Sequence, residues 1–216
     1  MATTVRVDIV SDIVCPWCLI GWERLKRAAA MLEGEIEIDA HWLPFELNPE
    51  MPAAGVDRQA YLVAKFGQAR AEEVTDRLAA AAAADGISMH FDRVRRQPNT
   101  FAAHRLLHWA EQEGRGTALK EALFQAHFVD GKFIGDEDTL VGLADHAGLD
   151  SQRAREVIET EALADDVRSL EARAREIGIQ GVPFFILDQK LALSGAQAPE
   201  VMVGALREAV ATREAA

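Results

Sequence analysis

Strand patterns at the two ends of the chain enclose a long stretch of helical periodicity. Residues 5–10 and 35–43 alternate apolar with polar side chains and are rich in β-branched residues, and residues 18–33 between them have a helical pattern. This order predicts a β-α-β unit with a parallel strand pair. The remaining terminal elements are expected as strands over 182–187 and 191–194, forming a hairpin, and a last helix over 199–213.

From about residue 57 to residue 177 the pattern is helical throughout, after a loop with three prolines at residues 44–52. Helices are expected over 58–68, 71–84, 98–113, 116–129, 137–147, 151–160 and 162–177, with Asp57, Asp136 and Asp150 as N-caps. The chain is therefore predicted to be an α/β domain with a large all-helical insertion. Residues 1–50 and 178–216 would form the sheet domain and residues 51–177 the insertion, whose last helix, about 162–177, is a candidate to pack on the sheet.

Charge and hydropathy narrow the possible environments and partners. The 216 residues carry a formal net charge of -12, which argues against general binding to nucleic acids or to anionic membranes. No apolar run approaches the ~20 residues of a membrane span. The N-terminus lacks the pattern of a signal peptide, so a cytoplasmic location is expected. The sequence does not indicate an oligomeric state.

The only two cysteines form the motif Cys15-Pro16-Trp17-Cys18, between the first strand and the first helix. Cys15 is expected at the helix N-cap with Pro16 at the first helical position. The helix N-terminus favours negative charge, so we expect Cys15 to be the attacking sulfur and Cys18, one turn further in, the resolving one. Trp17 offers an apolar face beside the sulfurs.

Two other interpretations of the cysteines have less support in the sequence. A zinc site needs further ligands, and the nearest histidine pair, His104 and His108, lies far along the chain without the glutamate of a zincin motif. Two inert buried thiols are disfavoured by the proline between them at a strand-to-helix junction. Redox chemistry is therefore the favoured interpretation.

A second motif, Gly181-Val182-Pro183, opens the strand predicted at residues 182–187. Proline is unusual at a central strand unless its peptide bond is special, so a cis Val182–Pro183 bond is predicted, the alternative being a trans proline at a strand start. A cis bond would expose the Val182 backbone as a short edge beside Cys15, where a substrate strand could pair.

Motifs along nearly the whole chain resemble one family: residues 11–21, 44–49, 98–100 with 103–106, 181–185 and 194–197. The sequence resembles the DsbA-like branch of the thioredoxin superfamily, and within it the FrnE-like proteins, described as polyketide-biosynthesis dithiol–disulfide isomerases. The resemblance implies a thioredoxin fold (a mixed sheet flanked by helices) with a helical insertion, a cis Pro183, and exchange through Cys15 and Cys18. No cofactor is implied beyond this redox-active pair, with glutathione as a candidate reductant.

Three further residues have two interpretations each. Asn99 and His104 would line the substrate groove by the family's arrangement, or be a helix N-cap and a core histidine. Asp12 would tune proton transfer to Cys18, or cap a loop, and the loop role is favoured.

The function predicted from the sequence is protein thiol–disulfide exchange, with Pro16, Trp17, Gly181 and Val182 contacting a disulfide-containing protein or a small thiol. One alternative is a glutathione-dependent enzyme of the kappa-transferase and 2-hydroxychromene-2-carboxylate isomerase type, which resembles this fold with serine at the nucleophile position. Another is a thioredoxin-like binding or adaptor module.

Overall fold

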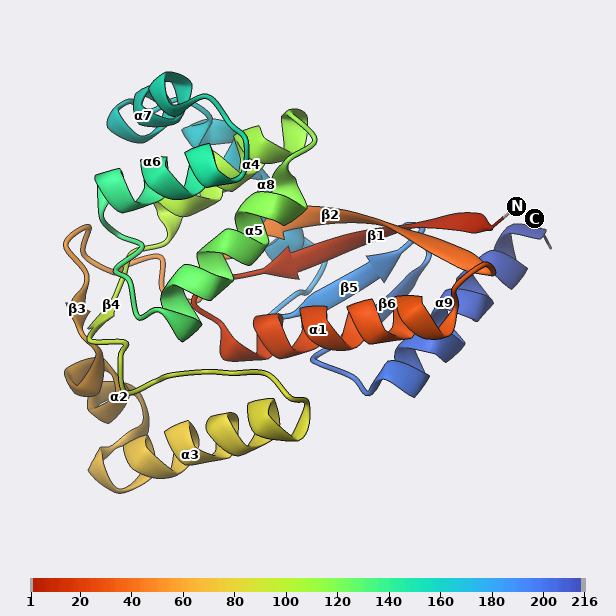
Figure 1. Ribbon diagram of the computed structural model, residues 1–216, viewed down its shortest axis with the longest axis horizontal. Coiled ribbons are helices and arrows are strands. Elements are labelled where there is room, and N and C mark those ends of the chain that lie inside the picture. The colour runs from red at the N-terminus through yellow and green to blue at the C-terminus, as the bar shows by residue number, and fades with distance from the viewer. Residues whose placement is uncertain (1, 215–216) are drawn as a thin grey trace.

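A four-stranded mixed sheet forms the centre of the computed structural model, which describes residues 2–214 (Figure 1). The strand order is β2-β1-β5-β6. Strand β1 (Thr3–Ser11) runs parallel to β2 (Ile36–Pro44) and antiparallel to β5 (Phe184–Leu187), and β5 pairs antiparallel with β6 (Leu191–Ser194). The predicted mixed sheet, built from both ends of the chain, is therefore confirmed.

Strand β1 is covered on both faces over residues 7–11, which are all buried although the sequence alternates apolar with polar side chains. Val7 and Ile9 belong to the core cluster that includes residues of α1 (Pro16–Met31) and α9 (Pro199–Glu214), two helices in contact with each other (Figure 1). Val10 belongs to a smaller cluster with Phe45 and with Ala174 of α8 (Ala164–Glu176). Successive strand residues point to opposite faces, so both layers can use the same strand.

The segment between β2 and β5 is mainly helical and packs against the sheet through α4, α5 and α8, each of which contacts β2. Asp57, Asp136 and Asp150 accept a hydrogen bond from the backbone amide three residues on, at 2.8, 2.9 and 2.7 Å, which confirms the predicted N-caps. The helices are α2 (Arg58–Phe66), α3 (Gln68–Ala84), α4 (Phe101–Gln112), α5 (Gly116–Phe124), α6 (Glu137–His146), α7 (Ser151–Glu159) and α8.

Two features of this segment differ from the sequence prediction. It is not helical throughout, because β3 (Val56–Asp57) and β4 (Arg96–Gln97) pair as a short antiparallel ribbon. The helix expected over 116–129 ends as α5 and continues as a π-helical turn, η1 (Gln125–Val129). The wider π-helical turn keeps the three successive residues 126–128 buried, a local adjustment that helical periodicity does not reveal.

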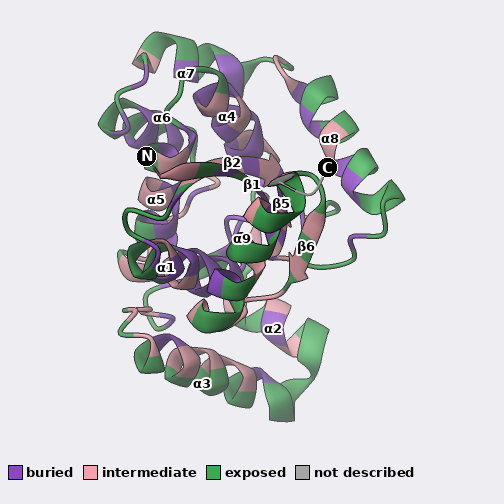
Figure 2. Cartoon of the chain, turned by 90° about the vertical axis from the view of Figure 1, so that its right-hand side faces the viewer, coloured by how far each residue is buried: buried purple, intermediate pink, exposed green. Residues whose placement is uncertain are grey.

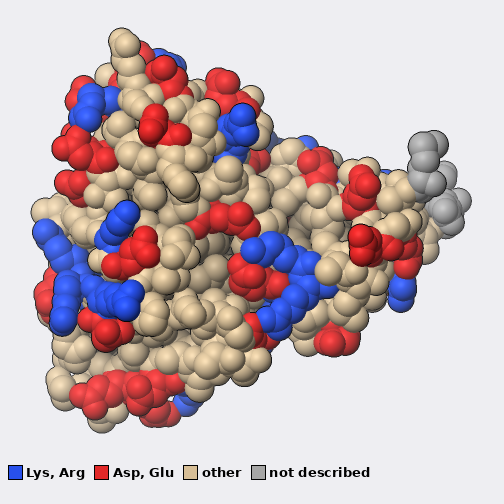
Figure 3. Space-filling model, in the orientation of Figure 1, with Lys and Arg blue, Asp and Glu red and all other residues tan. Residues whose placement is uncertain are grey.

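Helices α2 and α3 form an exposed arm beside this core. Helix α3 buries only Ala71 and Ala82 among its described residues, and Figure 2 shows most of its surface as exposed or intermediate. Acidic and basic side chains are intermixed on the face drawn in Figure 3. No helix within residues 2–214 combines the length and the apolar character needed to cross a membrane.

Candidate active site

The Cys15–Cys18 motif begins helix α1 at the end of the sheet where β1 stops. Cys15 is the N-cap residue, with φ -87° and ψ 112°, and Pro16 opens the helix, as predicted. Both cysteines are free thiols and both are buried, Cys15 with 4% and Cys18 with 1% of its surface exposed. Trp17 between them is 38% exposed. The motif therefore exposes the ring of Trp17 to solvent while both sulfurs are buried.

The loop before β5 meets Cys15 across a separation of 167 residues. The Cys15 thiol donates to the Val182 carbonyl with a sulfur–oxygen distance of 3.5 Å, and the Val182–Pro183 bond is cis, as the sequence predicted. Gly181 is exposed, Val182 is half-buried and Pro183 is buried. Gly21 on α1 packs so closely here that a Cβ added to it would lie 3.0 Å from Pro183 Cγ. The two sequence motifs thus form one site.

A buried carboxylate lies behind the dithiol. The backbone carbonyl of Asp12 accepts a hydrogen bond from the Cys15 amide at 3.2 Å. The carboxylate of Asp12 accepts a hydrogen bond from the Leu47 amide at 2.8 Å, and its other oxygen lies 3.3 Å from Nε2 of His104. Burial opposes ionisation of Asp12, but the contacts with His104 and Leu47 outweigh it and lower its pKa. Asp12 therefore holds a negative charge close to the dithiol and also ties the loop after β2 to β1.

Two residues predicted to line a substrate groove have structural partners instead. His104 is buried against Asp12, behind the dithiol, and so does not face a substrate surface in this structure. Asn99 donates from Nδ2 to the Met51 carbonyl at 2.8 Å and accepts from the Phe101 amide at 2.9 Å. Asn99 thus lies one residue before the N-cap, Thr100, and its side chain holds the first amide of α4 and joins the helix to the preceding loop, so the predicted N-cap is off by one residue.

Lys120 on α5 is a charged residue of the site that the sequence prediction missed. Its side chain is completely buried, with Nζ 5.0 Å from the ring centroid of Trp42 and 4.8 Å from that of Phe124. Burial lowers the pKa of Lys120 to about 8, against the negative charges at Cys18 and Asp12. In the sequence Lys120 stands three residues before Leu123 and four before Phe124. This spacing places Lys120 on the apolar face of the helix and could have indicated that it is buried.

The two thiols titrate as a pair that shares a proton. Burial opposes ionisation of Cys18, but the neighbouring Cys15 thiol, the positive charge of Lys120 and the hydroxyl of Ser11 lower its pKa overall. The hydrogen bond to Cys18, together with burial, raises the pKa of Cys15 well above its ordinary value. The pKa of Cys18 is thus shifted downward and that of Cys15 upward within the pair. The helix N-terminus, from which the sequence favours negative charge at Cys15, is one of several influences on the pair, and the Cys15 sulfur makes no capping hydrogen bond.

Two further buried carboxyl groups, Glu46 in the loop after β2 and Glu171 on α8, lie close to each other. The backbone amide of Glu46 donates to Oε1 of Glu171 on α8 at 2.6 Å, and Arg175 donates to the Glu46 carbonyl at 3.2 Å. Burial, together with the negative charges of Glu171 and Asp12, raises the pKa of Glu46 to about 8. Glu46 is therefore a neutral acid near pH 7, adjacent in sequence to the Leu47 amide that holds Asp12.

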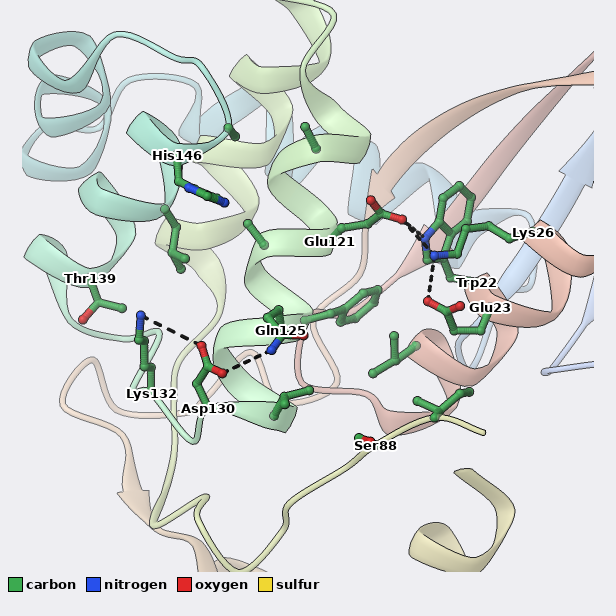
Figure 4. A pocket seen from close by; sticks show the side chains of 18 of the residues that line it. Trp22, Glu23, Lys26, Ser88, Glu121, Gln125, Asp130, Lys132, Thr139 and His146 are labelled. Carbon is green, nitrogen blue, oxygen red and sulfur yellow. Dashed lines mark hydrogen bonds and ion pairs between the residues drawn. The ribbon is translucent and has the colours of Figure 1, made fainter. Parts of the chain in front are cut away.

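A groove of about 1340 Å³ runs along α1 away from the dithiol, between α1, the α5–α6 region and the segment after α3 (Figure 4). Leu19, next to Cys18, lines it, together with Trp22 and Lys26 one and two turns further on. The Trp22 indole donates to Glu121 at 2.8 Å, and Lys26 also contacts Glu121 at 3.1 Å. Polar side chains of α1 and α5 that line the groove are thus paired with one another.

Comparison with solved structures places this architecture among known proteins. The probable DsbA oxidoreductase SCO1869 from Streptomyces coelicolor is 40% identical, with a TM-score of 0.86 over 96% of this chain and 90% of that chain. The cytosolic disulfide reductase DsbM from Pseudomonas aeruginosa shares the fold at 20% identity, with a TM-score of 0.65 over 97% of each chain; it has also been solved with GSH. A 2-hydroxychromene-2-carboxylate isomerase shares the fold at 15% identity, with a TM-score of 0.70 over 97% of this chain and 98% of that chain.

Sequence comparison gives the same assignment. The uncharacterized protein YwbO from Bacillus subtilis (strain 168) is 29% identical over 95% of this chain and 97% of its own length. The model of the DSBA-like thioredoxin domain matches residues 6–207, nearly the whole chain. The chain therefore belongs to the family of DsbA-like thioredoxin-fold oxidoreductases.

Proposed function

We propose that this protein is a thiol–disulfide oxidoreductase in which Cys15 forms the mixed disulfide with the substrate and Cys18 resolves it. The observation that carries the proposal is the contact of the Cys15 sulfur, at the first turn of α1, with the Val182 carbonyl at 3.5 Å. Cys15 is the sulfur directed at the loop whose backbone would pair with a substrate chain, and Cys18 lies deeper. Exposed Trp17 and Gly181, with Pro16, complete the proposed contact surface.

The proton shared by the two thiols allows Cys15 to attack although its pKa is raised. Transfer of that proton to Cys18 leaves the thiolate on Cys15, which attacks one sulfur of a substrate disulfide and releases the other as a thiolate. After Cys18 loses its proton, its thiolate attacks the Cys15 sulfur, forms the Cys15–Cys18 disulfide and releases the second substrate sulfur. Two electrons pass from the dithiol to the substrate, whose two thiolates take up protons. In the opposite direction the same steps oxidise a substrate dithiol.

Repeated reduction needs an external thiol, and we propose glutathione as that reductant. The neighbouring fold of DsbM, solved with GSH, supports this choice. A glutathione molecule would reduce the Cys15–Cys18 disulfide through a mixed disulfide at Cys15, and a second would release it as oxidised glutathione. We place the reaction in the cytoplasm, in line with the cytosolic location that DsbM's name states.

Paired cysteine variants test the proposal, because the chain holds no third cysteine. We expect Cys15→Ser to abolish the reduction of insulin in a turbidity assay. We expect Cys18→Ala to accumulate a mixed disulfide between Cys15 and the substrate, visible by mass spectrometry under non-reducing conditions. Full insulin reduction by the Cys15→Ser protein would refute the mechanism. Glutathione-dependent isomerisation of a small aromatic substrate by the Cys18→Ala protein would favour the isomerase alternative.

A further inference from the structure

A lysine with no polar partner is buried within the helical segment, outside the elements that carry the proposed chemistry. Nζ of Lys120 has no hydrogen-bond partner among the described residues, and the side chain is 0% exposed. Transfer of an isolated ammonium group into a protein interior is costly unless an opposite charge compensates. A buried lysine without hydrogen bonds therefore points to compensation by nearby negative charge.

Aromatic rings confine this charge and exclude water from it. Nζ of Lys120 lies over the rings of Trp42 on β2 and Phe124 on its own helix. Trp42 packs edge-on against Trp22 of α1, with ring centroids 5.0 Å apart, and its indole donates to Thr117 of α5 at 3.1 Å. These contacts join α5 to the sheet and to the helix that carries Cys18. In such a dry environment a charge acts strongly on its neighbours.

The groups that face Lys120 come from several elements. The negative charge at Cys18 acts on it most strongly, followed by Asp12, Cys15 and Glu111 of α4. His104 on α4 contacts Asp12 from the helical segment. His127 on η1 is also buried, and burial lowers its pKa to about 4, so it is neutral near pH 7. Geometry connects Lys120 to Cys18 through the aromatic rings: its Nζ lies 5.0 Å from the Trp42 ring centroid, and Trp42 packs against Trp22, one turn along α1 from Cys18.

We propose that Lys120 is a positioning residue for the resolving step, in which its ammonium group stabilises the thiolate of Cys18. The inference rests on the proposed oxidoreductase function and extends it. While Cys15 is held in a mixed disulfide, it has no thiol proton to donate to Cys18. Lys120, the Ser11 hydroxyl and the Asp12 backbone then remain to stabilise the thiolate that must attack, and Lys120 is the only one of them that carries a charge. The helical segment between β2 and β5 would in this way take part in the chemistry of the dithiol.

Removal of Cys15 isolates the effect of Lys120 on the pKa of Cys18, because Cys18 is then the only thiol that titrates. The pKa of Cys18 would be followed by thiolate absorbance at about 240 nm in Cys15→Ala and in Cys15→Ala with Lys120→Met. We expect Lys120→Met to raise the pKa of Cys18 by about one unit, which corresponds to about tenfold less thiolate at neutral pH. We expect Lys120→Arg to bring the pKa most of the way back to its value with Lys120 in place. Lys26→Met is the matched control, since Lys26 lies on the same helix as Cys18 but is 42% exposed and already paired with Glu23.

An unchanged Cys18 pKa in Lys120→Met, or an equal shift in Lys26→Met, would overturn the proposal. Should Lys120→Met fail to fold, the reciprocal measurement keeps Lys120 in place: the pKa of Lys120 is followed by NMR of its ε carbon in the reduced protein and in Cys18→Ala. Loss of the Cys18 charge should lower the pKa of Lys120 further, and an unchanged value would refute the coupling. These titrations need no turnover, so they succeed or fail independently of the insulin assay.

Discussion

Glu46 offers a direct test of the electrostatics behind the dithiol. Its side chain is 6% exposed, one oxygen has no hydrogen-bond partner among the described residues, and the carboxylates of Glu171 and Asp12 act on it. Its pKa is raised from 4.5 to about 8, so the folded protein retains a proton that the unfolded chain loses. Glutamine mimics the neutral acid. We therefore expect Glu46→Gln to stabilise the folded protein, relative to the unmodified protein, increasingly as the pH rises.

The magnitude follows from proton linkage. Between the unfolded pKa of 4.5 and the folded pKa of about 8, the free energy of unfolding falls with rising pH, because the folded state binds one more proton. Each pH unit in this window costs about 1.4 kcal/mol. From about pH 5 to about pH 7.5, Glu46 thus lowers the free energy of unfolding by about 3 kcal/mol. Solvent screening of the partly accessible carboxyl group makes this value an upper bound.

Urea denaturation at these two pH values measures the effect. The difference in unfolding free energy between Glu46→Gln and the unmodified protein should increase by about 3 kcal/mol in favour of the variant on going from about pH 5 to about pH 7.5. Glu50→Gln, an exposed position of the same loop, is the matched control and should show no such increase. Parallel pH profiles for Glu46→Gln and the unmodified protein would refute the reasoning, because they would mean that Glu46 is ionised in the folded state.

Two further substitutions test the packing around the site. Gly21→Ala places a methyl group 3.0 Å from Pro183 and 3.1 Å from Phe185, so we expect slower insulin reduction and a lower melting temperature, and unchanged values for both would contradict the close packing. Asn99→Ala removes hydrogen bonds to the Met51 carbonyl and to the first turn of α4, which we expect to cost about 1 to 3 kcal/mol in urea denaturation while insulin reduction is retained. A large loss of activity at full stability would instead indicate that Asn99 contacts the substrate.

Local patterns in the sequence predicted most of the architecture. Alternation of apolar residues located the strands, and the aspartates before each expected helix located caps that the structure confirms at Asp57, Asp136 and Asp150. These signals depend on backbone geometry over a few residues, so they can be read without knowledge of the fold. The short β3–β4 ribbon and the π-helical turn were missed, because each depends on contacts that such patterns do not encode.

The sequence by itself determined the order of elements, the place of Cys15 and Cys18 at a helix start, and the loop at Val182–Pro183. The tertiary structure alone decided the electrostatics of the site. It brought Lys120 from α5 into range of Cys18 and paired Glu46 with Glu171, 125 residues away in the chain. Periodicity reports which face of a helix is buried but not which charge lies opposite. The positive charge that acts on Cys18 therefore comes from a residue that no local motif around the dithiol contains.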